Sequence, residues 1–125
     1  MDVNFFCADI NDYEITEEYD IIFSSGIFHY LKPERREKFI QNLKEITNLN
    51  GIHAINVFVE KPFIKVAPDS EESELLNEPW YSGELMQYYH EWLFKKYEEE
   101  ISDYNSGGIP HQHCVNRMIA EKILG

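Results

Sequence analysis

The sequence contains no glycine-rich loop of the kind that binds phosphate or nucleotide groups. It has 6 glycines, and the single adjacent pair, Gly107 and Gly108, falls late in the chain. A P-loop or a dinucleotide-binding fingerprint needs several closely spaced glycines between a strand and a helix. Neither of these motifs is present in the 125 residues.

Positive charge and long apolar runs are also scarce. The chain has 11 basic against 23 acidic residues, which gives a net charge of −12. Nucleic acids and anionic membrane surfaces are bound through an excess of Lys and Arg, so we expect neither as a partner. No apolar run approaches the length needed to span a bilayer, and the acidic start does not resemble a signal peptide.

Only two cysteines are present, Cys7 and Cys114, and they do not form a closely spaced pair. This number and spacing of cysteines favours free thiols in a cytoplasmic protein over a disulfide scaffold. Hydrophobic residues make up 43% of the chain and aromatic residues 14%. A sequence of this length and composition predicts one folded domain over residues 1–125.

The amino-terminal half predicts a βαβ unit. Strands are expected at 3–8, 19–24 and 52–59. The second contains Ile21, Ile22 and Phe23 without polar alternation, which is typical of a parallel strand buried on both faces. A helix is expected to begin at Lys32-Pro33-Glu34, because proline and an acid are favoured in a first turn. It ends before Gly51, and its apolar stripe consists of Phe39, Ile40, Leu43 and Ile46.

The second half predicts a long connection, a helix and a hairpin. Residues 60–79 form a connection of the length expected for a lid or binding loop. Ser82 is expected to cap a second helix, whose apolar face is Leu85, Met86, Tyr89, Trp92 and Leu93. Strands at 95–101 and 113–124 flank the turn at 106–110 and favour an antiparallel hairpin. The predicted fold is α/β, with a mostly parallel sheet, a C-terminal antiparallel hairpin and helices on the faces.

Polar residues follow the first two predicted strands. Asp9 comes after the first, and Ser24, Ser25 and Gly26 end the second. Open α/β sheets bind ligands at the carboxyl ends of their strands, so these residues are candidates for a binding site. Two simpler interpretations remain open: Asp9 begins a turn with Asn11 and Asp12, and Ser24–Gly26 is a tight turn between strand and helix.

His29 and Tyr30 follow that turn. A histidine titrates near neutral pH, so His29 is a candidate acid or base. The alternative is a hydrogen-bonded packing residue beside Phe28 and Tyr30.

A metal site is a weaker hypothesis. His111 and His113 would share one side of a strand near Cys114, but a closed zinc site needs four ligands. Histidines that pack in the hairpin or line an acceptor site are favoured instead. The acidic cluster at 69–74 lacks the spacing of a calcium loop and is expected to be a solvated lid. We therefore predict no metal.

Taken in order, these segments resemble the second half of a class I S-adenosylmethionine-dependent methyltransferase, most closely the tellurite-resistance (TehB-like) type. The matching segments are Ala8-Asp9-Ile10, Tyr19-Asp20-Ile21-Ile22, residues 24–31, Leu49-Asn50-Gly51-Ile52, residues 79–85 and residues 116–122. The resemblance covers nearly the whole chain.

The resemblance implies S-adenosylmethionine as cofactor and a small molecule as methyl acceptor. Asp9 would accept a hydrogen bond from the adenine amino group, and Ile10 would pack on the adenine ring. Ser24, Ser25 and Gly26 would border the methionine part of the cofactor. His29 and Tyr30 would lie near the methyl donor or the acceptor and are the candidate catalytic residues.

The chain departs from the family pattern at its start. Such enzymes carry a glycine-rich loop after their first strand and an acidic residue at the end of their second, and Met1 falls after both. We therefore expect a partial domain that binds the cofactor poorly and is inactive by itself. The alternatives are a non-catalytic dimeric interaction module without cofactor, or a half-enzyme completed by a separate chain.

The same departure predicts an exposed strand edge. In the family, the missing strands sit between the strand ending at Asp9 and the strand starting at Tyr19. Asp20–Ser24 is then an uncovered apolar edge, which proteins usually pair or cover. We expect a homodimer or a strand-exchanged dimer, in which residues 3–8 pair with Ile21–Ser24 of their own chain or of a partner chain.

Overall fold

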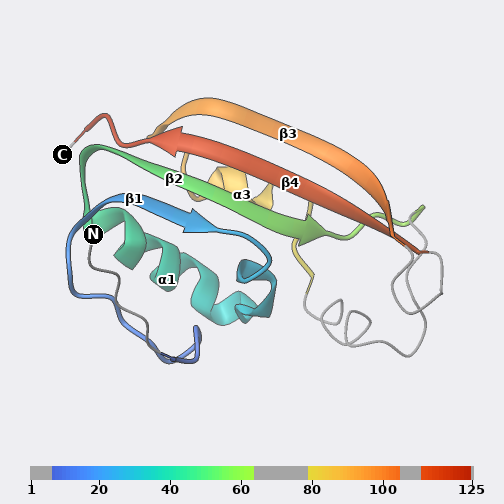
Figure 1. Ribbon diagram of the computed structural model, residues 1–125, viewed down its shortest axis with the longest axis horizontal. Helices are drawn as coiled ribbons and strands as arrows, with labels where there is room; N and C mark the ends of the chain where they lie inside the picture. The colour runs from blue at the N-terminus through green and yellow to red at the C-terminus, as the bar shows by residue number, and fades with distance from the viewer. Residues whose placement is uncertain (1–6, 64–78, 105–110, 125) are drawn as a thin grey trace.

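The computed structural model describes residues 7–63, 79–104 and 111–124. Its elements are the strand β1 (Tyr19–Ser24), the 3-10 turn η1 (Phe28–Tyr30), the helix α1 (Pro33–Glu45), the strand β2 (Thr47–Val59), the helix α3 (Glu84–Gln87), and the strands β3 (Leu93–Tyr104) and β4 (His111–Glu121). Figure 1 shows their arrangement. Most of the strand expected at 3–8, and the acidic cluster at 69–74, lie outside the described residues.

The strands form one mixed sheet in the order β1-β2-β4-β3. β1 and β2 are parallel and joined through α1, as the βαβ pattern predicts. β2 pairs antiparallel with β4, and β4 pairs antiparallel with β3, so the expected hairpin is present. The expectation of a mostly parallel sheet is wrong for the described strands. The hairpin inserts β4 between β2 and β3, and this makes two of the three pairings antiparallel.

Helix α1 begins where its sequence predicts. Pro33 lies in its first turn with Glu34, and its buried face includes Phe39, Ile40 and Leu43. From Gly51 onward the residues of β2 alternate between buried and half-buried, and Ile55, Val57 and Val59 are buried on the side that packs with α1. No helix in the described part of the chain is long and apolar enough to cross a membrane.

The second helix is much shorter than expected. α3 spans Glu84–Gln87, and Gly83 precedes it with a φ of 82°. Ser82 does not cap it, because its hydroxyl donates a hydrogen bond to Glu99 instead. The chain then turns, with Tyr89 and Trp92 buried.

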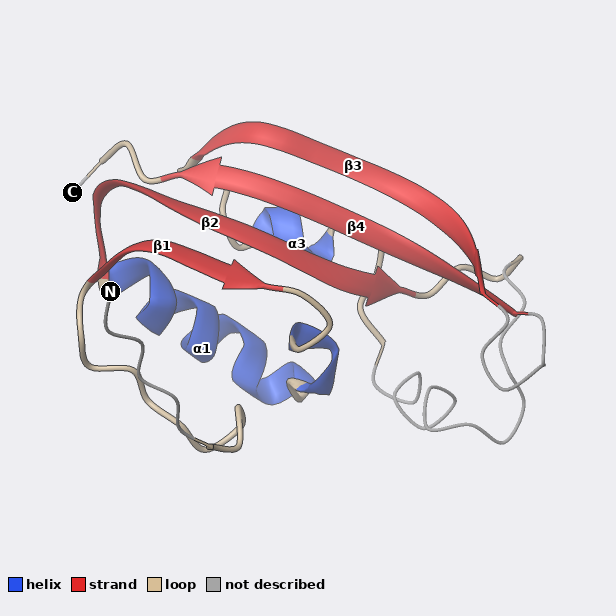
Figure 2. Cartoon of the chain, viewed as in Figure 1, coloured by secondary structure: helices blue, strands red, loops and turns tan. Residues whose placement is uncertain are grey.

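Within the described residues, α1 and α3 cover the same face of the sheet (Figure 2). Residues of both regions join one core cluster with the same side of β2 and β4. The cluster is Phe28, Leu31, Phe39, Ile40, Leu43, Ile55, Val57, Val59, Trp80, Leu85, Tyr89, Trp92, Cys114, Met118 and Ala120. Helices were expected on the faces of the sheet, and in this part of the chain they cover one face.

Candidate functional site

The turn after β1 brings three of the predicted site residues together. Ser24 is 9% exposed, and its buried Oγ has no hydrogen-bond partner among the described residues. Ser25 is exposed, and its Oγ accepts a hydrogen bond from Asn56 Nδ2 at 3.4 Å. Gly26 has a φ of 72°, a conformation that glycine adopts at little cost. A Cβ at this position would lie 3.8 Å from His29 Cε1, which is an ordinary contact distance. Glycine is therefore favoured here by the positive φ and not by a lack of space.

His29 belongs to an aromatic stack across the sheet. Its ring lies 5.3 Å from that of Phe58 at an interplanar angle of 18°, and 4.4 Å from the ring of Tyr30. Phe58 in turn stacks on His113 at 4.4 Å and 8°. Tyr30 is 44% exposed. The stack fixes the plane of the His29 imidazole at the carboxyl end of β1.

Asp9 begins a hydrogen-bonded turn. Its Oδ1 accepts bonds from the Asn11 backbone N–H at 2.9 Å and from Asn11 Nδ2 at 3.4 Å. Its carbonyl oxygen accepts from the backbone N–H groups of Asp12 and Tyr13 at 3.0 Å. The carboxylate is nevertheless exposed, while Ile10 is half-buried and packs against the core cluster. Forming a turn and presenting a carboxylate to a ligand are compatible roles for Asp9.

Asn11 connects this turn to the segment after β1. Its Nδ2 donates to the Tyr30 carbonyl at 3.2 Å, and its Oδ1 accepts from the Lys32 backbone N–H at 3.0 Å. One side chain therefore holds Asp9 beside the His29–Tyr30 turn. The expected turn of Asp9 with Asn11 and Asp12 is confirmed. The bonds from Asn11 to Tyr30 and Lys32 were not predicted, because Asp and Asn in turns commonly bond nearby backbone.

The histidines of β4 are packing groups in this structure. His111 is buried, and its ring lies perpendicular to that of His113 at 4.9 Å. Burial raises the pKa of the neighbouring Cys114 thiol, which disfavours the thiolate form that binds metals. Among the residues described, no group of three or more His, Cys, Asp or Glu could hold a metal ion.

Comparison with known proteins gives a consistent result. The family model for the tellurite resistance protein TehB matches residues 1–109. A protein of Haemophilus influenzae named "Probable S-adenosyl-L-methionine-dependent methyltransferase TehB" is 32% identical over 96 residues, which are 76% of this chain and 31% of that protein. The chain thus spans about a third of the length of the curated relatives it matches.

Solved structures agree with the sequence match. The crystal structure of TehB from Haemophilus influenzae superposes with a TM-score of 0.74 and 29% identity, covering 92% of this chain and 39% of that one. The N-methyltransferase NodS from Bradyrhizobium japonicum, in complex with S-adenosyl-L-homocysteine, gives a TM-score of 0.55 at 12% identity, covering 92% of this chain and 52% of that one. At such low identity, the second match supports the fold alone.

Proposed function

Because this chain belongs to the tellurite resistance protein TehB family, we propose that it forms the adenine and acceptor side of an S-adenosylmethionine-dependent methyltransferase acting on a small molecule. The observation that carries this proposal is the contact of Asn11 with both Asp9 and Tyr30. It brings two polar segments, distant in sequence, to the carboxyl end of β1, where α/β sheets bind ligands.

The side chains at this edge suit parts of the cofactor. The exposed Asp9 carboxylate can accept a hydrogen bond from the adenine amino group, and Ile10 offers an apolar surface beside it. The Ser24 hydroxyl has an unused hydrogen-bonding capacity next to Ser25 and Gly26, which supports their place beside the methionine part. A buried hydroxyl without a partner in the described structure is a reasonable place to expect a ligand.

The cofactor supplies an electrophilic methyl group on its sulfonium sulfur. Transfer of that group is a displacement in which alignment and exclusion of water contribute much of the rate, and no enzyme nucleophile is needed. We assign His29 and Tyr30 to the acceptor side. The stack on Phe58 holds the His29 ring in place to accept or orient a proton of the acceptor.

These 125 residues lack a glycine-rich loop and an acidic residue for the ribose. We propose that by themselves they bind the cofactor weakly and do not catalyse transfer. The site would then be completed by further protein, either in the same chain or in a separate one. We also propose a cytoplasmic location, consistent with an exposed Cys7 and a buried Cys114 that are both free.

The test is an NMR titration of the 125-residue chain with S-adenosylhomocysteine. We expect a dissociation constant of about 1 mM, equivalent to roughly 4 kcal/mol of binding. Backbone amide shifts should concentrate at residues 9–11 and 24–30. Asp9→Asn keeps an oxygen for the Asn11 turn but removes the charge, and should weaken binding several-fold. Asp12→Asn, in the same turn, is the matched control and should bind like the parent chain.

Two results would contradict parts of the proposal. Absence of shifts at these residues at several millimolar ligand would remove the cofactor-site assignment. Submicromolar affinity would show that the glycine-rich loop is dispensable.

The second candidate function is a non-catalytic interaction module. It is favoured by the exposed apolar residues of β1, since Ile21 is 67% and Phe23 72% exposed. A chain that self-associates through β1 and gives no cofactor shifts would support this alternative over the methyltransferase half.

A further inference from the structure

The turn that carries His29 and Tyr30 is anchored at both of its ends. Phe28 and Leu31 flank the two candidate catalytic residues and are 2% and 1% exposed. Between them, His29 is half-buried and Tyr30 is exposed. The backbone N–H of Leu31 donates to the Phe28 carbonyl at 3.0 Å, which closes the turn. The buried ends therefore decide where the two central side chains lie.

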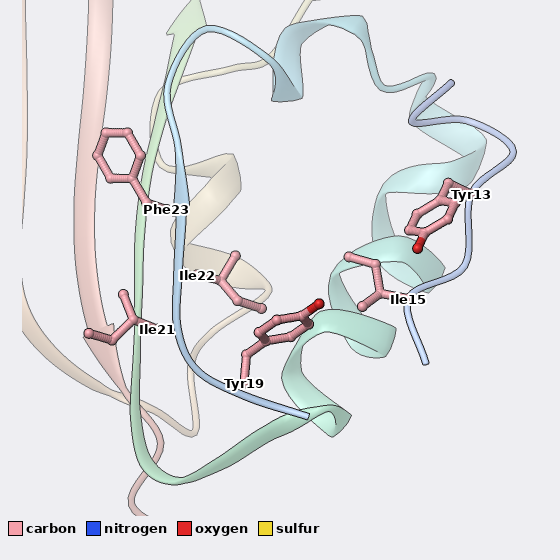
Figure 3. A pocket seen from close by; sticks show the side chains of 6 residues that line it. All are labelled: Tyr13, Ile15, Tyr19, Ile21, Ile22 and Phe23. Atoms are coloured by element: carbon pink, nitrogen blue, oxygen red, sulfur yellow. The ribbon is translucent and has the colours of Figure 1, made fainter. Parts of the chain in front are cut away.

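The strand before this turn is positioned by a different set of contacts. Along β1, Ile22 and Tyr19 point toward Ile15, and Ile21 and Phe23 point to the other side of the strand (Figure 3). Among the residues described, the hollow that these side chains help to line includes none from the turn. The position of the turn therefore depends on the bonds that the turn itself makes with other elements.

A tryptophan from a distant segment bonds the first end of the turn. The indole Nε1–H of Trp80 donates to the Phe28 carbonyl at 3.0 Å, and both residues are buried. The two positions are 52 residues apart in the sequence. The Phe28 carbonyl thus accepts one hydrogen bond from inside the turn and one from outside it. A buried indole N–H is costly to leave unpaired, so this bond fixes the turn relative to Trp80.

Trp80 is itself held in place at the end of β2. It pairs with Val59 in a parallel β-bridge, and its carbonyl accepts a hydrogen bond from the Glu60 backbone N–H at 2.9 Å. The Arg36 guanidinium lies 4.3 Å from the centre of its ring. Arg36 Nε also donates to the Leu31 carbonyl at 3.2 Å. Trp80 and Arg36, which contact each other, therefore hold opposite ends of the turn.

We propose that Trp80 is a positioning residue for the acceptor side of the site, an inference that rests on the function proposed above. Its indole N–H holds Phe28, and through this short turn it keeps the His29 ring stacked on Phe58, at 5.3 Å and 18°. Because Trp80 is 1% exposed, it acts through His29 and not by contact with a ligand. Methyl transfer depends on alignment, so a group that supports a site residue contributes to the rate without touching the substrate.

The test removes the indole N–H and keeps the size of the ring. The chain has two tryptophans, Trp80 and Trp92. In a Trp92→Phe background, biosynthetic replacement of tryptophan by benzothienylalanine therefore alters position 80 alone, with a sulfur atom in place of the N–H group. The reference is the Trp92→Phe chain that carries ordinary tryptophan. Both chains are compared by NMR without ligand.

Two changes are expected in the chain that lacks the N–H. Hydrogen exchange of the Tyr30 and Leu31 amides should become about tenfold faster, because the carbonyl that anchors their turn has lost one donor. The His29 ring protons, which the stacked Phe58 ring shields, should move downfield. Amides of the β2–β4 pairing report opening of the whole fold and should change much less.

Trp80→Phe is the second variant, and Trp92→Phe by itself is its matched control. Trp92 is 6% exposed, and its ring lies 4.5 Å from that of His53, so the control removes an indole that packs on His53 and not on Phe28. Trp80→Phe should move the His29 ring signals, whereas Trp92→Phe should leave them in place. Urea unfolding measures the loss of stability that the two changes share.

Two results overturn the proposal. The first is unchanged His29 ring signals together with unchanged exchange at Tyr30 and Leu31 when the N–H is removed. The second is exchange that becomes faster by the same factor throughout the β2–β4 pairing, since Trp80 would then only stabilise the fold. A failure of the proposed function would appear elsewhere, as absent shifts at residues 9–11 in the cofactor titration, with these ligand-free results unaffected.

Discussion

The guanidinium of Arg36 donates a hydrogen bond to the carboxylate of Glu84 at 2.9 Å, and the two side chains are 3% and 17% exposed. The same guanidinium donates to the carbonyl oxygens of Leu31 at 3.2 Å and Pro79 at 3.1 Å. It also lies 4.3 Å from the ring centre of Trp80. The buried guanidinium of Arg36 in α1 thus holds the segment that leads into α3, residues 79–84, against the core.

Arg36→Ala is expected to lower the free energy of unfolding by about 3–5 kcal/mol, because it leaves a shielded Glu84 carboxylate without its partner. Urea denaturation at pH 7 measures the change. Lys38→Ala, at an exposed position on the same helix, should alter stability by no more than about 0.5 kcal/mol. A loss for Arg36→Ala as small as the control would mean that the ion pair is unimportant.

Gly51→Ala should lower the stability of the fold, because the added Cβ has no space. A Cβ there would lie 2.5 Å from Thr47 Cγ2, 2.7 Å from the Asn48 carbonyl oxygen and 2.8 Å from that of Asp20. Backbone atoms cannot move aside cheaply, so we expect a loss of about 2–3 kcal/mol in thermal or urea unfolding. Gly83→Ala is the comparison, because no heavy atom lies within 4 Å of its Cβ and only its φ of 82° is unfavourable. That change should cost about 1–2 kcal/mol, and equal losses at both positions would contradict the steric explanation.

His53 makes stability depend on pH. It is fully buried, with Nε2 2.7 Å from Thr47 Oγ1 and Nδ1 2.7 Å from the Tyr89 hydroxyl. Thr47 donates its own proton to the Leu43 carbonyl, so it accepts from Nε2–H, and Nδ1 accepts from Tyr89. Both nitrogens are therefore satisfied in the neutral ring. Burial, together with the nearby positive charge of Lys44, lowers the pKa of His53 to about 3.

The unfolded chain binds a proton at His53 below about pH 6.5, but the folded chain does not until about pH 3. This contribution to stability is therefore complete above pH 6.5 and is lost as the pH falls toward 3. The slope is at most about 1.4 kcal/mol per pH unit. His53→Gln should flatten the decline between pH 6.5 and 4.5 in urea unfolding, whereas His90→Gln, at an exposed position, should not. Parallel declines for the parent and His53→Gln would show that other groups cause the pH dependence.

Local patterns predicted the parts of the fold that depend on neighbouring residues. The start of α1 at Pro33, its buried stripe and the terminal hairpin all follow from periodicity and turn residues. The order of the strands does not follow from these local patterns, because the placement of β4 between β2 and β3 depends on contacts between distant segments. The run Ile21–Phe23 predicted burial on both faces, but the strand lies at the edge of the sheet, where Ile21 and Phe23 are exposed.

The candidate site was predictable only as separate pieces. Residues at strand ends identified Asp9, Ser24–Gly26 and His29 as candidates. The link through Asn11 was not visible, since its contacts with Tyr30 and Lys32 join positions 19 and 21 residues apart. The length of α3 was also unpredictable, because its apolar positions fit a longer helix as well as the observed turn to Trp92.

Asn116 is the polar centre of the core face of β4. Its side chain is completely buried, and its Oδ1 accepts hydrogen bonds from the Gly83 backbone N–H at 3.1 Å and from the Tyr97 hydroxyl at 2.6 Å. Its Nδ2 donates to Glu99 at 2.9 Å. Asn116→Leu would leave the two donors without an acceptor, so we expect a loss of about 2–4 kcal/mol. Gln112 lies on the same strand as Asn116, and Gln112→Leu breaks one exposed hydrogen bond to Asp103 of β3, so this change should cost much less.

Asn116→Asp tests the charge of this network. Hydrogen bonds from Ser82 and Asn116, with the ion pair to Lys61, lower the pKa of Glu99 to about 2. A second carboxylate at position 116 would lose the Nδ2 donor and repel Glu99, so at least one of the two acids would have a raised pKa when folded. The folded variant would then bind protons more readily than the unfolded one. Its stability deficit against the parent should therefore shrink as the pH falls from 7 to 4.5 in urea unfolding. The Asn116→Leu deficit should stay constant over the same range, and an equally constant deficit for Asn116→Asp would contradict a charge-based role for Glu99.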